Sequence, residues 1–352
     1  MTSPPSPKLS IVLTTFNGGS FIREQLASVA AQTLRPHELV VCDDGSTDDT
    51  LAIVADFERA APFPVRLQRN PARLGYAENF LQGCSLAQGD LIAFCDQDDV
   101  WQPEKLARCA AAFVADETVL LAIHSATVVD RDLRPRGHCK PDFARSEHLA
   151  PRGCELEFSQ PGFAMVFSAA LVRAIDWRQR VRDFLKADRP LMAHDQWIVF
   201  LARSLGRVVH LRERLALYRQ HGGNTCGAAD AGPPPVPTLQ PAANETAYRE
   251  RAEASRNYGQ YLLGLASRVP RDWSAKLRVS AGHYHSQSKI YSARAHLYER
   301  NRNFWERVGT CASLWRQRAY RSRRASGLGW RAAIKDTGAL VFGEVNPLGL
   351  FR

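Results

Sequence analysis

Short apolar stretches alternate with stretches of helical periodicity over the first 130 residues of the chain. The stretches typical of buried strands are Leu9–Thr14, Glu38–Cys42, Val65–Arg69, Leu91–Cys95 and Val119–Val129. Those with apolar residues at three- and four-residue spacing are Ser20–Gln32, Asp48–Ala60, Tyr76–Ala87 and Pro103–Ala115. Ser46 or Thr47 is the expected N-cap of the second helix. This alternation predicts an α/β fold with parallel β-α-β units and helices over both faces of the sheet.

The pattern changes twice beyond this region. Residues 150–225 contain further strand and helix signals, including a helix over Gln196–Leu205, but their order is not fixed by the pattern. Residues 227–243 are rich in Pro, Gly and Ala, which is typical of a linker, and helical periodicity resumes from Glu245. We expect a first domain over residues 1–226, a linker over 227–244 and a helical region over 245–352.

Charge divides the chain at the same place. The net charge is +10, yet residues 241–352 hold 20 Lys and Arg against 8 Asp and Glu, whereas residues 1–240 hold 26 against 28. The segment Trp315–Lys335 has seven cations and no acidic residue. Basic residues interleaved with aromatic ones favour docking at an anionic membrane surface, although a solvated helix face has the same composition. No nucleic-acid-binding motif accompanies the charge.

Composition restricts the class of protein. No run of about 18 apolar residues is present, so no transmembrane helix is expected. The first eight residues lack the basic and apolar segments of a secretory signal. The eight cysteines are scattered without paired spacing, which indicates reduced thiols in a cytoplasmic protein rather than a disulfide framework or a structural zinc site.

Three carboxylates follow the fourth predicted strand directly. They are Asp96, Asp98 and Asp99, and grouping them after a buried strand is costly unless a cation offsets their repulsion. Asp96 and Asp98 are two residues apart, so on an extended segment they project to one side and address one ion. Carboxylate oxygens suit Mn²⁺ or Mg²⁺ shared with phosphate. The alternative is a solvated acidic turn that caps the next helix.

Polar residues also follow the first two strands, at the edge where such sheets bind ligands. Asp43 and Asp44 suit hydrogen bonds to a base or ribose, although an Asp-Gly turn explains them equally well. Thr14, Thr15 and Asn17 lie where the backbone of a loop can face a nucleotide, or where glycines simply allow a tight turn. The loop matches neither a dinucleotide fingerprint nor a Walker loop.

Two later segments carry groups suited to transfer chemistry. Asp195 opens a predicted helix, where it either caps the helix or serves as a general base for an acceptor hydroxyl. Arg219, His221 and Asn224 lie in a donor-rich loop that either neutralises a departing diphosphate or forms a surface turn.

Taken in order, these segments resemble the family 2 glycosyltransferases, which have the GT-A fold. The resemblance spans about residues 8–226 and rests on residues 10–17, 32–33, 40–48, 75–80, 94–101, 194–197 and 218–224. Each motif is modest, but the ordered set is specific. The segments around Asp96 and Tyr218 look most like bacterial rhamnosyltransferase-type members. One departure is His194, where many members have a second carboxylate before the catalytic one.

The resemblance implies a role for each site residue. Asp44 would contact the nucleotide base, and Asp96 with Asp98 would form the D-x-D motif, Asp98 being the principal ligand of Mn²⁺ or Mg²⁺. Asp195 would be the catalytic base. The remaining nucleotide-binding positions would be Thr14, Thr15, Asn17, Asp43 and Asp96, and the diphosphate would meet Arg219, His221 and Asn224 from a mobile loop.

The function expected on this basis is an inverting, metal-dependent glycosyltransferase. Its donor would be dTDP-rhamnose or a UDP-hexose, and its acceptor a hydroxyl of a cell-surface polysaccharide or a lipid-linked oligosaccharide. The enzyme would be cytoplasmic or peripheral on the inner face of the plasma membrane. The alternatives from other classes are a non-catalytic module that binds nucleotide sugars or glycans, and a membrane scaffold that uses the basic tail.

Overall fold

The computed structural model describes residues 7–151, 160–184, 191–224, 241–299, 301–321, 328 and 330–342. These residues fall into two compact units. The first comprises Met1–Cys154, Phe158–Val181 and Leu191–Gly227, and the second comprises Glu155–Glu157, Arg182–Pro190 and Ala228–Arg352. Most of the predicted linker, up to residue 240, lies outside the described residues, and a helix begins at Pro241, inside the segment predicted as linker.

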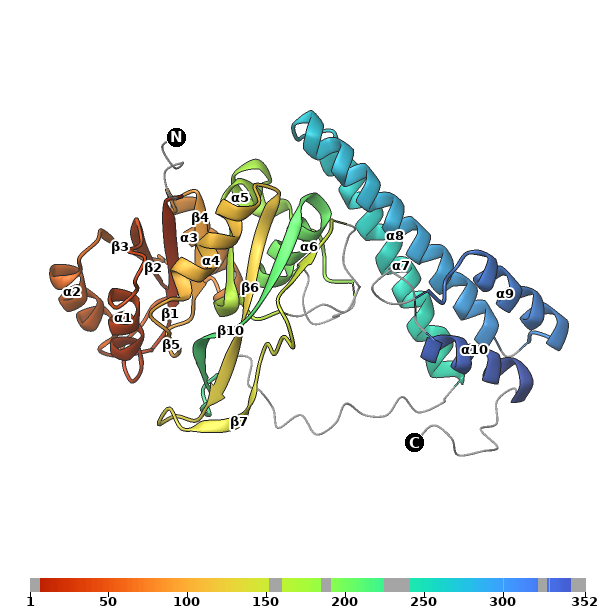
Figure 1. Cartoon of the computed structure of the whole chain (residues 1–352), viewed down its shortest axis with the longest axis horizontal. Helices are drawn as coiled ribbons and strands as arrows, with labels where there is room; N and C mark the ends of the chain where they lie inside the picture. Colours follow the sequence, from red (N-terminus) through yellow and green to blue (C-terminus); the bar gives the residue numbers. More distant parts are fainter. Residues whose placement is uncertain are drawn as a thin grey trace. The chain divides into compact units, whose positions relative to one another are not determined.

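A mixed, mostly parallel sheet forms the centre of the first unit (Figure 1). Its strands are β1 (Leu9–Thr15), β2 (Glu38–Asp43), β3 (Val65–Arg69), β4 (Leu91–Cys95), β5 (Val100–Trp101), β6 (Val119–Val129), β7 (Pro135–Cys139), β8 (Glu147–Leu149), β9 (Met165–Ser168) and β10 (Arg207–Arg219). The main path runs β3-β2-β1-β4-β9-β6-β10-β5, with β7 paired to β6 and β8 to β10. Strand β9 runs antiparallel between β4 and β6, whereas β1 to β4 are mutually parallel. The predicted α/β class is confirmed.

Helices flank this sheet. They are α1 (Ile22–Ala30), α2 (Thr50–Ala60), α3 (Tyr76–Leu86), α4 (Lys105–Ala115), α5 (Ala170–Ala174) and α6 (His194–Leu205), with 3-10 turns at Gly162–Ala164 and Trp177–Gln179. The predicted N-cap of α2 is wrong. Its N-cap is Asp49, because the Ser46 hydroxyl instead accepts a hydrogen bond from the Asn17 backbone N–H at 2.9 Å.

Pairing register brings the ends of three strands to one edge of the sheet. Thr15 at the end of β1 pairs with Asp43 at the end of β2, and Leu13 pairs with Cys95 at the end of β4. Strand β1 is buried along its whole length. The polar residues that follow these strands therefore lie at the carboxyl edge of the sheet, where ligands bind in such folds.

The second unit consists of helices α7 (Pro241–Ala266), α8 (Arg271–Tyr298), α9 (Phe304–Arg316) and α10 (Trp330–Phe342) within its described part. Helices α7 and α8 pack along each other (Figure 1). Asp336 of α10 is fully buried and receives two hydrogen bonds of 2.9 Å from the Arg294 guanidinium. The Tyr298 and Tyr320 hydroxyls donate to the same carboxylate at 3.0 Å. No helix in the described part of the chain is long and apolar enough to cross a membrane.

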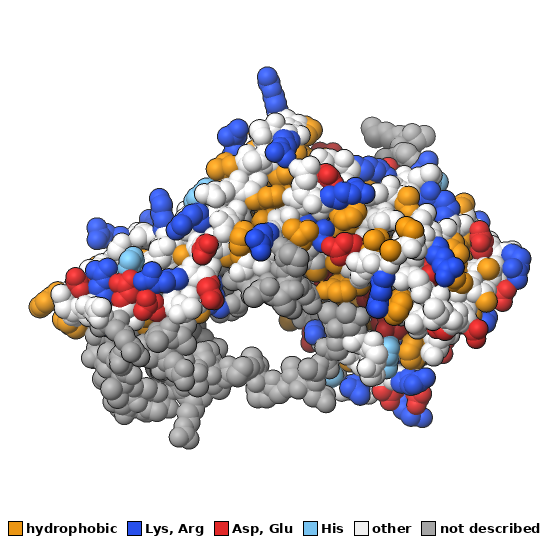
Figure 2. Space-filling model, turned by 180° about the vertical axis from the view of Figure 1, so that it is seen from behind, with side chains coloured by type: hydrophobic (Ala, Val, Ile, Leu, Met, Phe, Trp, Pro, Cys, Tyr) orange, Lys and Arg blue, Asp and Glu red, His pale blue; other side chains and the backbone are white. Residues whose placement is uncertain are grey.

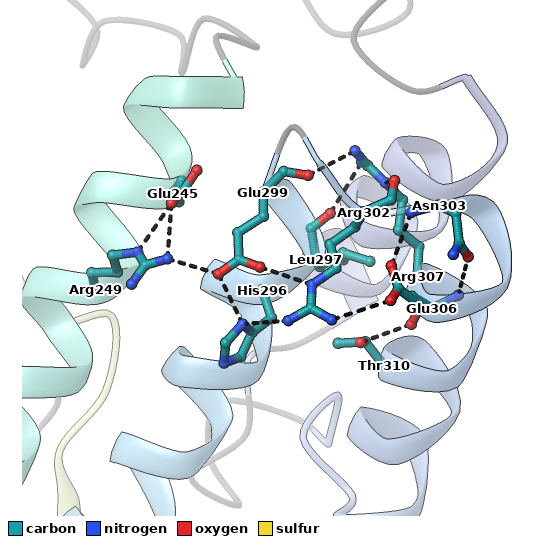
Figure 3. A network of polar contacts seen from close by, with 10 residues as sticks. All are labelled: Glu245, Arg249, His296, Leu297, Glu299, Arg302, Asn303, Glu306, Arg307 and Thr310. Carbon is teal, nitrogen blue, oxygen red and sulfur yellow. Dashed lines mark hydrogen bonds and ion pairs between the residues drawn. The ribbon is translucent and has the colours of Figure 1, made fainter.

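A polar network joins α7, the end of α8 and the start of α9 (Figure 3). The Glu299 carboxylate accepts hydrogen bonds from Arg249 at 2.7 Å and from Arg302 at 2.8 Å. Arg307 donates to the Leu297 and Glu299 carbonyls at 3.1 and 3.0 Å, which satisfies the free carbonyls at the end of α8. This network fixes the direction in which α9 leaves the turn.

The six cysteines in the described residues are free thiols, five of them buried. They are Cys42, Cys84, Cys95, Cys109, Cys139 and Cys311. Over the surface in Figure 2, Lys and Arg side chains are interspersed with acidic ones in many places.

Candidate active site

An open pocket lies beyond the ends of β1 and β2. Its volume is about 550 Å³, and it is lined by Phe16, Asp44, Gly45, Arg69, Asn70, Pro71, Ala72 and Arg73. The Asp44 carboxylate is almost fully buried and accepts hydrogen bonds from the backbone N–H groups of Leu74 and Gly75 at 2.7 and 2.9 Å. The Arg73 guanidinium lies 3.7 Å from the centre of the Phe16 ring. The pocket thus combines an oriented carboxylate with a flat aromatic and cationic wall.

Asp43 has a different environment from Asp44. One carboxylate oxygen accepts a hydrogen bond from the Thr15 hydroxyl at 2.9 Å, and the other accepts from the Gly45 and Ser46 backbone N–H groups at 3.1 and 3.0 Å. Gly45 has a φ of +92°, so the turn favours glycine there. Asp43 closes the turn that presents Asp44 to the pocket, and Thr15 supports it from β1.

The loop after β1 is tied to its neighbours by its polar side chains. Asn17 adopts a φ of +49°, and its side-chain Oδ1 accepts a hydrogen bond from the Thr47 backbone N–H at 2.9 Å. Gln97 bonds both polar atoms of the Phe16 backbone, accepting from its N–H at 2.9 Å and donating to its carbonyl at 3.2 Å. Thr14 is buried at the end of β1. The two hydrogen bonds of Gln97 hold the pocket wall at Phe16 against the segment that contains Asp96 and Asp98.

Of the carboxylates after β4, Asp99 is fully buried and Asp98 is 14% exposed, and the N-cap of α4 is Glu104, so a solvated acidic turn that caps the next helix does not describe them. Burial raises the pKa of Asp96 to about 7, and repulsion from Asp98 and Asp195 adds to the rise. Burial also raises the pKa of Asp99 well above its usual range. Asp99 is fully buried and accepts a hydrogen bond from the Arg219 backbone N–H at 3.0 Å. Asp96, Asp98 and Asp195 therefore form one electrostatically coupled group.

Lys105 compensates part of this negative charge, and it is not among the site residues predicted from the sequence. Its side chain is fully buried, and its ammonium donates to the Phe163 carbonyl at 2.7 Å and lies 3.3 Å from the centre of the Trp101 ring. Burial lowers the pKa of Lys105 to about 8, against the attraction of Asp99 and Asp96, which raises it. A lysine in the first turn of an amphipathic helix gives no sequence signal for this position.

Arg219 is the last residue of β10, and its side chain is only 3% exposed. Its guanidinium donates to the Asp98 carbonyl at 2.7 Å, to the Arg131 carbonyl at 2.6 Å and to the Glu24 carboxylate. From the sequence, this group is predicted to contact the diphosphate. In the structure each of its three nitrogen atoms donates to protein, and the group holds the segment of Asp98 against α1.

His221 and Asn224 converge on Asp98. The His221 Nε2 atom lies 2.9 Å from Asp98 Oδ2, and the Asn224 amide donates to the same oxygen at 3.1 Å. The Asn224 side chain also accepts from the His221 backbone N–H at 2.5 Å, and the His221 ring stacks on Phe21. The predicted loop residues and the predicted principal metal ligand are thus in direct contact.

Asp195 lies inside the first turn of α6 rather than capping it. The N-cap residue is Ala193, and Asp195 accepts a hydrogen bond from the adjacent Gln196 N–H at 2.7 Å. The preceding His194 is buried, stacks on Phe80 at 4.2 Å and meets Phe94 edge-on. This aromatic packing anchors the N-terminus of α6 and so positions Asp195 near Asp96.

The comparisons with known proteins agree with this geometry. Residues 10–173 match the family described as Glycosyl transferase family 2. The chain is 27% identical to the uncharacterized glycosyltransferase alr2836 of Nostoc sp. (80% of this chain, 84% of that protein), and 26% identical to the dTDP-rhamnosyl transferase RfbG of Shigella flexneri (61% and 74%). The crystal structure of S. aureus TarS superposes with a TM-score of 0.51 at 18% identity, covering 94% of this chain and 52% of that one, which supports the fold alone. The chain therefore contains a family 2 glycosyltransferase domain over residues 10–173 and is a glycosyltransferase enzyme.

Proposed function

We propose that this enzyme transfers a sugar from a nucleotide diphosphate to an acceptor hydroxyl with inversion, and that the transfer depends on a divalent metal ion. The observation that carries the proposal is the convergence of Asp96, Asp98, Asp195 and His221 beside the pocket that contains Asp44. One edge of the sheet thereby supplies a base-binding carboxylate, hard oxygen ligands and a candidate general base.

The donor set suits Mn²⁺ or Mg²⁺. Asp98 offers a 14% exposed carboxylate with His221 Nε2 beside it, and the mutual repulsion of Asp96, Asp98 and Asp195 is of the kind that a bound cation relieves. Within the described residues no three His, Cys, Asp or Glu side chains form a ready-made cage. We assign Asp98 as the main ligand, supported by Asp96, with phosphate oxygens completing the shell. When bound, the ion neutralises charge that develops on the diphosphate.

Asp195 is assigned as the general base. Its carboxylate would take the proton from the attacking hydroxyl while the bond to the anomeric carbon forms, so no covalent enzyme intermediate is needed. The aromatic packing of His194 keeps the N-terminus of α6 in place during this step. Because His194 is not a carboxylate, the proton has one acceptor at this position.

The loop after β10 is assigned to the diphosphate. His221 and Asn224 contact Asp98 through exchangeable hydrogen bonds, so both can turn to phosphate oxygens once the donor binds. Arg219 keeps its contacts with the Asp98 and Arg131 carbonyls and with Glu24, and so fixes the start of the loop. We assign Thr14 and Asn17 to the base side of the pocket, with Asp43 and Thr15 holding Asp44 in position.

Similarity to the dTDP-rhamnosyl transferase RfbG favours dTDP-rhamnose as the donor, with a UDP-hexose as the second choice. The proposed acceptor is a hydroxyl of a cell-envelope polysaccharide or of a lipid-linked oligosaccharide. Transfer to such an acceptor would take place on the cytoplasmic face of the membrane, where the basic second unit would dock on anionic lipid.

A donor panel tests the proposal. Purified enzyme is mixed with dTDP-, UDP- and GDP-sugars in Mn²⁺ or in chelator, and thermal shift and nucleotide diphosphate release are measured. One donor should stabilise the protein and be slowly hydrolysed, only with metal. Asp98→Ala should abolish both effects, whereas the control Asp132→Ala, on an exposed loop, should not. Metal-independent turnover would refute the metal assignment, and binding without turnover would favour a non-catalytic role.

A further inference from the structure

The outward face of helix α9 carries exposed aromatic side chains. Trp305 is 77% exposed, Trp315 58% and the adjacent Phe304 51%. Positions 305, 308, 312 and 315 follow helical spacing, so Val308 and Ala312 lie on the same face as the two tryptophans. Ten residues of helix separate the tryptophans by about 15 Å. An exposed tryptophan pair on one helix face is unusual, because aromatic side chains normally contribute to cores and interfaces.

Buried residues beside this face fix the orientation of α9. Cys311 and Leu314 are buried in two separate hydrophobic clusters of the second unit. At the helix start, Asn303 and Glu306 form a reciprocal capping box, with hydrogen bonds of 3.0 Å in each direction. The network of Figure 3 fixes the turn that leads into α9. The tryptophan face is therefore presented outward by a folded helix rather than by a loose segment.

Cations cluster at the C-terminal end of the same helix. Arg316, Arg318 and Arg321 are exposed, and within the part of the chain that the structure describes none of them has an ion-pair partner. The sequence from Arg307 to Lys335 contains no acidic residue. By contrast, Arg302 and Arg249 on the neighbouring turn and helix are both paired with Glu299. The unpaired positive charge thus lies at one end of the tryptophan face.

We propose that this face of α9, with Trp305, Trp315 and the three arginines, is the surface through which the enzyme docks on an anionic lipid bilayer. The inference deepens the proposed function by naming the membrane-binding element. Tryptophan is enriched at the level of lipid headgroups, where its ring meets hydrocarbon and its N–H meets water. Arginines beside it attract anionic headgroups. A helix lying in the plane of the interface needs this combination of one apolar face and flanking cations.

Vesicle co-sedimentation of the full-length enzyme tests the surface. The chain should bind vesicles of phosphatidylglycerol and phosphatidylcholine, and binding to phosphatidylcholine alone should be at least about tenfold weaker. The double variant Trp305→Ser/Trp315→Ser should lower partitioning at least about tenfold. Replacing Arg316, Arg318 and Arg321 with Gln should each weaken binding about fivefold, which corresponds to about 1 kcal/mol per charge.

Val279→Ser is the matched control. Val279 is 71% exposed on α8, so this variant also removes an exposed apolar group from the second unit, and it should bind vesicles like the wild type. Brominated lipids should quench tryptophan fluorescence of the wild type and not that of the double variant. Equal binding of wild type and double variant, equal binding to both lipid compositions, or no binding by the wild type would overturn the proposal. Sedimentation needs no donor, so its outcome is independent of the donor panel.

Discussion

Replacing Arg219 with lysine separates a positioning role from a diphosphate-binding role. The buried guanidinium donates to two backbone carbonyls and to Glu24. A lysine ammonium can reach one of these partners, which leaves at least one carbonyl, and up to two, without a donor. An unsatisfied buried acceptor costs about 1–3 kcal/mol, so Arg219→Lys should destabilise the first unit by about 3 kcal/mol.

Thermal melting converts this free energy into a measurable shift. A unit of about 200 residues loses about 2–4 °C in Tm per kcal/mol, so the first-unit transition should fall by about 6–12 °C. The control is Arg73→Lys, because Arg73 is 65% exposed at the pocket rim and should change Tm by less than about 2 °C. Calorimetry without donor reads both shifts. An unchanged Tm for Arg219→Lys together with a raised donor KM would refute the positioning role. Arg219 would then be assigned to diphosphate binding.

Three further changes test other parts of the structure. Asp195→Asn should lower kcat by about 10²–10⁴ while leaving the donor dissociation constant unchanged; a normal kcat would exclude Asp195 as the base. Because the pKa of Asp96 is raised to about 7, the folded protein binds more protons than the unfolded chain between about pH 4 and 7. The unfolding free energy in chelator should therefore fall as pH rises through this window, and Mn²⁺ should restore more of it at pH 7.5 than at pH 5; a flat profile would contradict the shift. Asp336→Leu leaves the buried Arg294 charge without its partner and should lower the free energy of unfolding, measured by chemical denaturation, by about 3–5 kcal/mol. The double variant Arg294→Met/Asp336→Leu should lower it clearly less. A double variant at least as destabilised as the single one would argue against a buried ion pair.

The first half of the sheet could be predicted because β1, β2 and β4 are buried along their whole lengths and so form short apolar runs. Strands β3 and β4 have the predicted bounds. Because ligands bind at the carboxyl ends of parallel strands, Asp44, Asp96 and Asp98 could be predicted to lie at one edge of the sheet. The second half could not be ordered from the pattern. Strand β9 is inserted antiparallel between β4 and β6 although it follows β6 in sequence, and four residues of a strand do not encode their partners.

Site residues were predictable where a strand end carries them and less so where burial decides their role. Lys105 and Arg219 are charged residues that the fold encloses, and composition alone gives no sign of enclosure. Asp43 and Asp44 are adjacent and chemically identical, yet the turn at Gly45 directs one into the loop and the other into the pocket. The N-cap of α2 was wrong because a long-range hydrogen bond from Asn17 competes for the Ser46 hydroxyl.

The pair of hydrogen bonds between Gln97 and the Phe16 backbone restricts how the sequence can vary. Gln97 stands between Asp96 and Asp98, and its side-chain oxygen occupies the space that a Cβ atom at Gly18 would enter. Any larger residue at position 18 would force the amide away and release both bonds to Phe16. In a set of homologues, glycine at the first position and glutamine at the second should therefore be gained and lost together, a pattern of covariation that an alignment can reveal without any experiment.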